Sequence, residues 1–190
     1  MARLKAPLLR PNSLWITSGD ALSSKGSKDT TMKEIEIKIA ITSCDVSELP
    51  EDEQKLIEKA KEATSNAYAP YSKFAVGAAL LLENGEIVTG ANQENAAFPS
   101  GTCAERSAIF YAQSQFPDSP ISKLAIAARN ENGFLSEPIT PCGACRQVIL
   151  GIEDRYGKKI QILLYGSEKT YIVGSATDLM PLSFVDSSMR

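Results

Sequence analysis

Hydrophobic and polar residues alternate over residues 35–41, where four isoleucines are separated by two charged residues and one alanine. A period of two is typical of a β-strand with one buried face, so this segment is predicted to be a half-buried strand. The period changes over 51–68, where acidic residues precede an apolar stripe with helical spacing and Pro70 follows the end. Acidic residues favour the first turn of a helix and proline disfavours its continuation, so the pattern predicts a helix over 51–68.

Two apolar runs, 74–82 and 86–93, flank the dipeptide Asn84-Gly85. An Asn-Gly pair between two such runs is a strong signal of a two-residue β-turn. The two runs are therefore predicted to pair as a β-hairpin.

Apolar patterning and turn signals predict five further elements. Thr140 and Pro141 suit the N-cap and first position of a helix, and Gly157 follows its end. The apolar run over 123–129 is continuous, which predicts a strand that is buried on both faces. The five elements are helices over 102–115 and 141–156 and strands over 123–129, 159–165 and 171–174.

The order of these elements indicates the fold class. A hairpin followed by strands that alternate with helices predicts an α/β domain with a mixed sheet and helices packed on its faces. Residues 32–190 are expected to form this single domain. Residues 1–31 are rich in serine, threonine and basic residues and have too little apolar surface to fold alone, so we expect a disordered or dispensable leader. A transit-type peptide has a similar composition, and that alternative stays open.

Composition narrows the class of protein further. The chain has 190 residues, 43% of them hydrophobic, with a net charge of −3 and a pI near 5.2, which favours a soluble globular domain over a nucleic-acid-binding protein. No apolar run approaches the length of about 20 residues that spans a membrane. Four cysteines without a secretory signal indicate a reducing compartment, and we expect the cytoplasm. The chain has no histidine, so a metal site would depend on thiolates and carboxylates.

Three of the four cysteines lie in two short motifs. Residues 102–105 read Thr-Cys-Ala-Glu and residues 141–145 read Pro-Cys-Gly-Ala-Cys. Cys103, Cys142 and Cys145 thus offer three thiolates, and a catalytic zinc site uses three protein ligands and leaves the fourth position open. Both motifs fall at predicted helix starts, where backbone N–H groups and the helix dipole favour the thiolate form of cysteine.

Charged residues in and after the motifs suit the chemistry of such a site. Glu105 lies two residues from Cys103, so its carboxylate can face the open side of the site without binding the metal. Arg106 and Arg146 each follow a motif and are predicted to donate hydrogen bonds to the sulfurs.

Three structural alternatives compete with catalytic zinc. Thr102 and Glu105 also fit a capping box, in which each side chain bonds the backbone of the other residue. A lone Cys-x-x-Cys is often redox-active or structural. A fourth protein ligand would make a closed, non-enzymatic zinc module, and Cys44 is the only spare thiol, although its sequence context is that of a small buried hydrophobe. The coincidence of both motifs, their order and their helix starts favours catalytic zinc.

In these motifs the chain resembles the small, three-cysteine cytidine deaminases of the tetrameric type, and the resemblance extends over residues 50–185. Zinc deaminases use three cysteines, or histidine and two cysteines, with a glutamate that does not bind the metal as general acid and base. The resemblance implies a three-layer αβα sandwich with a mixed central β-sheet and one Zn²⁺ per subunit. It also implies that Glu105 is the catalytic residue, that Arg106 supports the ligands, and that the protein is a homotetramer.

Two further stretches carry the resemblance near the expected substrate. Residues 71–78 resemble the family's loop and strand beside the base, which implies that Phe74 packs against the pyrimidine. Residues 90–96 resemble its ribose-binding stretch, which implies that Asn92 and Glu94 bond the sugar hydroxyls. Strand alternation puts Asn92 and Glu94 on one face, as a shared ligand requires. An ordinary core phenylalanine and a solvated polar strand end are the structural alternatives.

Residues 178–184 resemble the family's C-terminal segment, which implies that Phe184 enters the pocket of a neighbouring subunit. A phenylalanine in an apolar segment can also simply pack within its own chain. Ala104, between the ligand and the glutamate, is also expected to contact substrate.

The resemblance implies zinc-dependent hydrolytic deamination of cytidine and 2′-deoxycytidine, a reaction of pyrimidine salvage. The expected partner is a small nucleoside, with no nucleic acid and no membrane. A deaminase of polynucleotides would need basic and stacking surface, which the acidic composition disfavours. Deamination of another small aminopyrimidine stays open as an alternative.

Overall fold

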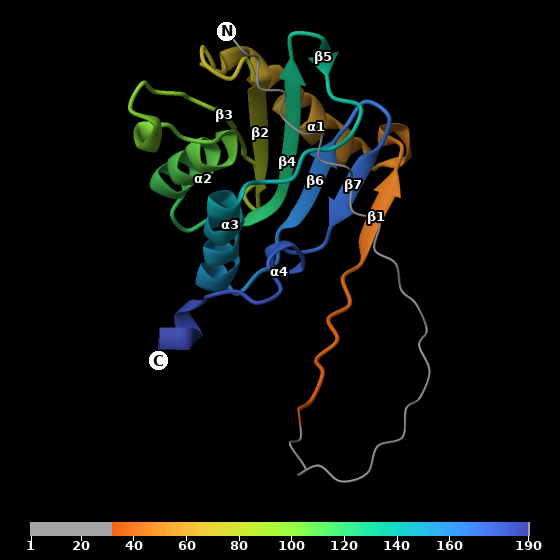
Figure 1. Cartoon of the computed structure of the whole chain (residues 1–190), viewed down its shortest axis with the longest axis vertical. Coiled ribbons are helices and arrows are strands. Elements are labelled where there is room, and N and C mark those ends of the chain that lie inside the picture. The colour runs from red at the N-terminus through yellow and green to blue at the C-terminus, as the bar shows by residue number, and fades with distance from the viewer. Residues whose placement is uncertain (1–31, 190) are drawn as a thin grey trace, which may run out of the picture. The chain divides into compact units, whose positions relative to one another are not determined.

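The computed structural model of the chain describes residues 32–189. By its contacts the chain divides into a unit that ends at Glu36 and a unit that begins at Ile37. Every helix and strand named below belongs to the second unit (Figure 1). The predicted leader over residues 1–31 lies outside the described residues.

The second unit is built from a seven-stranded sheet and flanking helices. In chain order the elements are β1 (Ile41–Cys44), α1 (Glu51–Ala63), β2 (Ala75–Leu82), β3 (Ile87–Ala91), α2 (Ala104–Gln115), β4 (Ile121–Asn130), β5 (Gly133–Phe134), α3 (Gly143–Tyr156), β6 (Gln161–Tyr165), β7 (Thr170–Val173) and α4 (Ala176–Leu179).

The strands form a mixed sheet in the order β1-β7-β6-β4-β2-β3, with β5 paired to β4 outside this path. The neighbours β4 and β6 are parallel, and the other pairs are antiparallel. Parallel strands need a crossover connection, and α3 supplies it between β4 and β6.

Alternate residues along the central strands face opposite sides of the sheet and pack against different helices. On one side α1 covers a cluster that includes Leu56, Ile57, Ala60, Ala79, Ala125 and Leu163. On the other side α2 and α3 cover a larger cluster that includes Ile109, Ile149, Leu80, Leu124, Ile126 and Ile162. Figure 1 shows α1 behind the sheet and α2 and α3 in front of it. The predicted three-layer αβα sandwich with a mixed sheet is confirmed.

The predicted hairpin is also confirmed. β2 and β3 pair antiparallel, with Leu80 opposite Val88, and Gly85 in the connecting turn has a φ of 88°. Gly157 ends α3 in the left-handed conformation, with a φ of 63°, as its position after the predicted helix indicated. β5 and α4 were not predicted, because two and four residues are too short to show a period.

The strand predicted over 35–41 is wrong. The regular strand β1 begins only at Ile41, and residues 33–40 have no regular secondary structure. Ile37 and Ile39 are 47% and 43% exposed, so the alternation has no buried face. The physical reason is the extent of the neighbouring strand, because β7 pairs with residues 41–44 and does not reach the preceding residues.

The helix predicted over 51–68 is shorter than expected. α1 ends at Ala63 and a 3-10 turn follows over Thr64–Asn66. The hydroxyl of Thr64 donates to the carbonyl of Lys61 at 2.7 Å, which satisfies one of the backbone acceptors at the helix end.

Candidate metal centre and active site

The topology of the sheet brings the two cysteine motifs to one place. α2 leads into β4 and α3 leads into β6, and these two strands are parallel neighbours. A helix that precedes a strand in this arrangement runs back along the sheet, so both helices begin near the carboxyl ends of the parallel strands. This is where α/β proteins usually bind ligands.

The three motif cysteines form one cluster at these helix starts. Their sulfurs all lie within 4.8 Å of one another. The Sγ atoms of Cys103 and Cys142 are 3.7 Å apart, and those of Cys142 and Cys145 are 3.5 Å apart. Two sulfurs bound at about 2.3 Å to one tetrahedral zinc lie about 3.8 Å apart, so the donor set fits this ion.

The electrostatics of the cluster also favour a cation. Burial raises the pKa of Cys103 and of Cys145, and the nearby carboxyl of Glu105 adds to both increases. Burial acts in the same direction on Cys142, but hydrogen bonds, the largest from the backbone N–H of Cys145, outweigh it and lower that pKa. A dication would offset the repulsion among three adjacent thiolates.

Both helices begin two residues later than predicted. The N-cap residues are Cys103 for α2 and Cys142 for α3, so each helix starts at a cysteine of the cluster. Thr102 is excluded from α2 because its backbone forms two hydrogen bonds of 2.9 Å with Gln93. The capping box is therefore wrong, and Glu105 is not used to cap the helix.

The two arginines that follow the motifs differ in role. Nη2 of Arg106 lies 3.8 Å from Sγ of Cys103, and this contact with the thiol raises the pKa of the guanidinium. Arg106 thus lies where it was predicted. Arg146 does not, because its guanidinium donates to the carbonyls of Pro141 and Leu179 and to the hydroxyl of Thr140. The prediction that Arg146 bonds the sulfurs is wrong, and the residue instead ties the start of α3 to the C-terminal segment.

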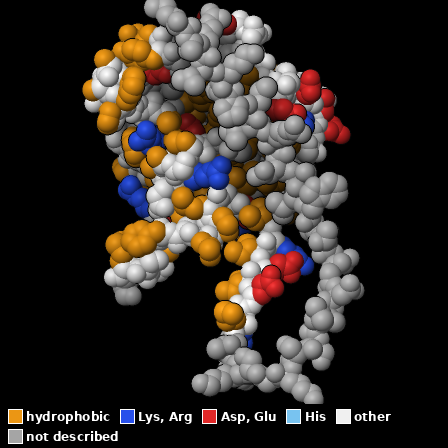
Figure 2. Space-filling view, viewed as in Figure 1, with side chains coloured by type: hydrophobic (Ala, Val, Ile, Leu, Met, Phe, Trp, Pro, Cys, Tyr) orange, Lys and Arg blue, Asp and Glu red, His pale blue; other side chains and the backbone are white. Residues whose placement is uncertain are grey.

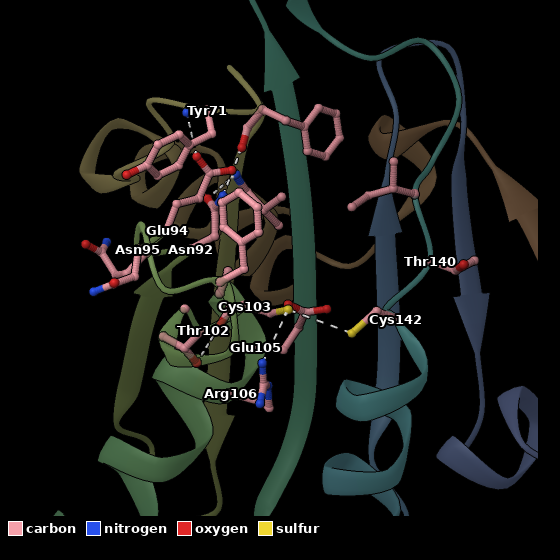
Figure 3. Close-up of a pocket in the computed structure, with 17 residues that line it drawn as sticks. Tyr71, Asn92, Glu94, Asn95, Thr102, Cys103, Glu105, Arg106, Thr140 and Cys142 are labelled. Atoms are coloured by element: carbon pink, nitrogen blue, oxygen red, sulfur yellow. Dashed lines mark hydrogen bonds between the residues drawn. The ribbon is translucent and has the colours of Figure 1, made fainter.

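Glu105 lies beside the cysteines but is not one of the clustered ligands. Its side chain is only 3% exposed, and burial raises the pKa of its carboxyl above the usual range. Figure 3 shows the carboxyl between Cys103 and Cys142. A buried carboxyl with a raised pKa holds a proton more readily than an exposed one and can still release it, which suits general acid and base catalysis.

A cavity of about 530 Å³ opens above this group. This volume lies within the range of small-molecule sites. Its walls include eight of the ten predicted site residues, with Cys145 and Phe184 as the exceptions, and they come from the β2 and β3 ends and from both helix starts. The eight are Phe74, Asn92, Glu94, Cys103, Ala104, Glu105, Arg106 and Cys142.

The side chains of Asn92 and Glu94 face the cavity from the end opposite the cysteines (Figure 3). Both side chains already form hydrogen bonds with the backbone of the protein. Asn92 donates to the carbonyl of Phe74 at 2.9 Å and accepts from the N–H of Val76 at 2.8 Å. Glu94 accepts from the N–H of Tyr71 at 2.8 Å.

Several cavity residues were missed from the sequence. Tyr71 and Phe98 form an edge-to-face pair, with ring centroids 5.7 Å apart, and both are more than half exposed. Ile139 and Thr140 add a wall just before the second motif. Tyr71 lies in the stretch that resembles the family's base-side loop, which is a signal of its position, whereas Phe98 shows none.

Two predicted residues lie away from the cavity. Phe184 is 59% exposed and does not line the cavity of its own chain, so its role in a neighbouring subunit stays a prediction. Cys44 lies on β1, partly buried, with its sulfur 4.0 Å from the carbonyl of Thr170. Cys44 is not among the clustered ligands of the described residues, which removes the basis for a closed four-cysteine site.

Comparison with known proteins agrees with this geometry. A family model described as the cytidine and deoxycytidylate deaminase zinc-binding region matches residues 50–157. A cytidine deaminase of Sporosarcina psychrophila is 51% identical over 98 residues, which cover 52% of this chain and 68% of that protein. A cytidine deaminase of Halalkalibacterium halodurans is 45% identical over 98 residues, covering 52% of this chain and 70% of that protein.

Solved structures show the same likeness. The crystal structure of cytidine deaminase from Burkholderia pseudomallei matches with 40% identity and a TM-score of 0.59, covering 68% of this chain and 97% of that chain. The cytidine deaminase of Mycobacterium tuberculosis matches with 32% identity and a TM-score of 0.55, covering 70% and 97%. The chain therefore belongs to the cytidine and deoxycytidylate deaminase family of zinc-dependent hydrolases.

Proposed function

We propose that the chain catalyses the hydrolytic deamination of cytidine and 2′-deoxycytidine to uridine and 2′-deoxyuridine, with release of ammonia, in pyrimidine salvage. The observation that carries this proposal is the position of Glu105. Its carboxyl is buried beside the three thiols but lies outside the ligand cluster, so it remains available for proton transfer. The names of the related proteins support the same substrate class.

Cys103, Cys142 and Cys145 would hold one Zn²⁺ per subunit. When bound, zinc supplies the Lewis acidity that makes water a nucleophile near neutral pH. Arg106, whose guanidinium lies next to Cys103, offsets part of the negative charge of three thiolates.

Glu105 would move the protons of the reaction. It takes a proton from the water that attacks C4 of the pyrimidine and delivers it to N3. It then takes the second proton of that water from the hydroxyl now on C4 and passes it to the exocyclic amine, which leaves as ammonia as the C4–N bond breaks and the C4 carbonyl forms. A carboxyl whose pKa is raised by burial suits both transfers, because it holds a proton more readily than an exposed carboxyl and can still release it.

The remaining predicted site residues would bind the nucleoside. We infer that Phe74 packs against the pyrimidine, that Ala104 contacts it near the metal, and that Asn92 and Glu94 bond the sugar. All four line the same cavity, with Ala104 next to Cys103 in the chain and with Asn92 and Glu94 at the end away from the cysteines (Figure 3). A nucleoside, which has a flat aromatic base and a polar sugar, matches this division better than a polynucleotide, which needs a basic groove.

We also propose a homotetramer in the cytoplasm, with Phe184 completing a neighbouring site. Exposed apolar side chains on α2 and in the C-terminal segment support an assembly, namely Phe110, Tyr111, Leu182 and Phe184. Figure 2 shows several hydrophobic patches on the face that carries these elements. Among the described helices, none has the length and hydrophobicity needed to cross a bilayer. The four free thiols suit a reducing compartment.

The test is a deamination assay followed by ultraviolet absorbance, with the variant Glu105→Gln. The variant keeps the size of the side chain but cannot carry the proton. Zinc should remain at one ion per chain, while turnover of cytidine should fall by a factor of at least about 100. Glu131→Gln, on the exposed turn between β4 and β5, is the matched control and should behave as the wild type.

Retained turnover in Glu105→Gln would contradict the proposed role. Turnover of single-stranded DNA, or of another aminopyrimidine in place of cytidine, would contradict the proposed substrate. A sizing column run on the same samples tests the assembly, and elution as a monomer at the assay concentration would contradict the tetramer.

A further inference from the structure

The segment over 71–74 contributes Tyr71 and Phe74 to the cavity and is held by hydrogen bonds from Asn92 and Glu94, which follow the neighbouring strand β3. Glu94 accepts from the N–H of Tyr71 at 2.8 Å and of Ser72 at 3.3 Å through the same oxygen. Asn92 donates to the carbonyl of Phe74 at 2.9 Å. The two side chains expected to bind the sugar therefore also hold the segment that carries Phe74, the residue expected to bind the base.

The backbone of this segment needs such support. Lys73 has a φ of 56°, the left-handed conformation that residues with a side chain rarely adopt, and it is the only described residue other than glycine with a positive φ. This conformation turns the chain between Ser72 and Phe74 at the start of β2. Hydrogen bonds on both sides of Lys73 are what keep the turn in place.

Ser72 connects the two sides of this turn. Its hydroxyl oxygen accepts from the N–H of Phe74 at 3.1 Å. The backbone N–H of Ser72 donates to Glu94 at 3.3 Å. Ser72 therefore contacts the carboxylate through its backbone and the N–H of Phe74 through its side chain.

We propose that Ser72 is a positioning residue that couples the sugar side of the cavity to the base side, by linking the carboxylate of Glu94 to the backbone of Phe74. A carboxylate has about four acceptor sites, so Glu94 can hold this loop and still accept from a sugar hydroxyl. Contact between the sugar and Glu94 then fixes the carboxylate, the carboxylate fixes Ser72, and Ser72 fixes Phe74 against the pyrimidine.

This inference rests on the proposed function, and its consequence is specific. Ribose and deoxyribose share the 3′-hydroxyl, so the coupling must act through that group if both nucleosides are substrates. Removing the 3′-hydroxyl from the substrate and the hydroxyl from Ser72 should then disrupt the same coupling. Their effects on kcat/KM should be less than additive, as in any cycle that changes two coupled groups.

The experiment compares 2′-deoxycytidine with 2′,3′-dideoxycytidine as substrates of wild type, Ser72→Ala and Ser72→Thr. Ser72 is exposed, so neither substitution should affect folding or zinc content. Ser72→Ala should lower kcat/KM for 2′-deoxycytidine by about threefold to tenfold, the effect of the one hydrogen bond that the hydroxyl accepts from the N–H of Phe74. The loss caused by the missing 3′-hydroxyl should be at least about threefold smaller in Ser72→Ala than in wild type. Ser72→Thr, which keeps the hydroxyl, should restore both values.

Ser114→Ala is the matched control, because Ser114 is an exposed serine on α2 with its own hydrogen bond, 2.9 Å to the carbonyl of Tyr111, and it does not line the cavity. Wild-type kinetics in Ser72→Ala, an equal 3′-hydroxyl effect in both proteins, or a Ser72→Thr variant as impaired as Ser72→Ala would each overturn the inference. Failure of the wild type to deaminate 2′-deoxycytidine would instead contradict the proposed function.

Discussion

Gly90 lies in β3 where the strand packs against α2, and replacing it with alanine should damage both stability and catalysis. A Cβ atom at this position would lie 2.5 Å from the backbone nitrogen of Ala108 and 2.7 Å from the carbonyl oxygen of Ala104. Both atoms belong to the helix backbone and cannot turn away as a side chain can. Relief of the clash requires β3 and α2 to separate by about 1 Å.

The size of the effect follows from this separation. Overpacking of a closely packed contact costs about 1–3 kcal/mol, so the free energy of unfolding should fall by that amount in Gly90→Ala. α2 also carries Glu105 and begins at Cys103, and a shift of about 1 Å in a catalytic group can reduce the rate about 100-fold. We therefore expect kcat/KM for cytidine to fall more steeply than the loss of stability alone would require.

Urea unfolding of the zinc-loaded protein and the deamination assay measure the two effects. The matched control is Gly151→Ala in α3, where an added Cβ has no atom within 4 Å. Alanine is favoured over glycine within a helix by about 1 kcal/mol, so this variant should be slightly more stable and fully active. Equal shifts in the two variants, or wild-type stability and activity in Gly90→Ala, would refute the reasoning.

Three further predictions concern stability, metal and pH. Glu153 is buried and accepts three hydrogen bonds, two of them from backbone N–H groups of buried residues. Glu153→Ala should therefore lower the free energy of unfolding by about 3 kcal/mol, and Glu153→Gln by less than half of that. Equal losses in the two variants would argue against unpaired donors as the cause. Cys142→Ala should lose zinc and show a lower Tm, because metal binding contributes to folding. Cys44→Ala should keep its zinc. Elemental analysis measures the zinc content of the two variants, and thermal unfolding measures their Tm. The hydrogen bond from Lys123 lowers the pKa of Asp52, so the contribution of this pair to stability is present above the unfolded pKa and is lost as the pH falls through the lower folded pKa. The Tm difference between Asp52→Asn and wild type should therefore shrink below about pH 4, and a constant difference would contradict the assignment.

Local patterns predicted the parts of the fold that local forces determine. The hairpin over β2 and β3 follows from an Asn-Gly turn between two apolar runs, and the end of α3 follows from Gly157. The clustering of the three motif cysteines could be predicted because three thiols at two helix starts have few structural explanations. In each case the residues that carry the signal lie within a few positions of one another.

Long-range contacts account for the predictions that were wrong. Thr102 fits an N-cap in sequence, but its backbone pairs with Gln93, nine residues away, so the helix begins later. Arg146 follows a cysteine motif, yet its guanidinium donates to the nearby carbonyl of Pro141 and to the carbonyl of Leu179, which the C-terminal segment brings close. The isoleucines of 35–41 have the period of a strand, but a strand also needs a neighbour, and β7 reaches only the last of them.

The backbone pairing between Gln93 and Thr102 also explains how the two halves of the site are held at a fixed separation. The helix half of the site consists of the starts of α2 and α3, which hold the cysteines and pack against the sheet. The loop half consists of residues 71–74 and 92–94, which depend on side-chain hydrogen bonds and are proposed to bind the nucleoside. Gln93 lies between Asn92 and Glu94, and its backbone makes a reciprocal pair of 2.9 Å bonds with the residue just before Cys103. A flexible sugar-binding loop would let the pyrimidine move relative to Glu105, and proton transfer requires hydrogen-bond contact. This backbone pair joins the segment with Asn92 and Glu94, the proposed sugar contacts, to the residue before Cys103, the first proposed metal ligand, so the loop half of the site takes its position from the helix half.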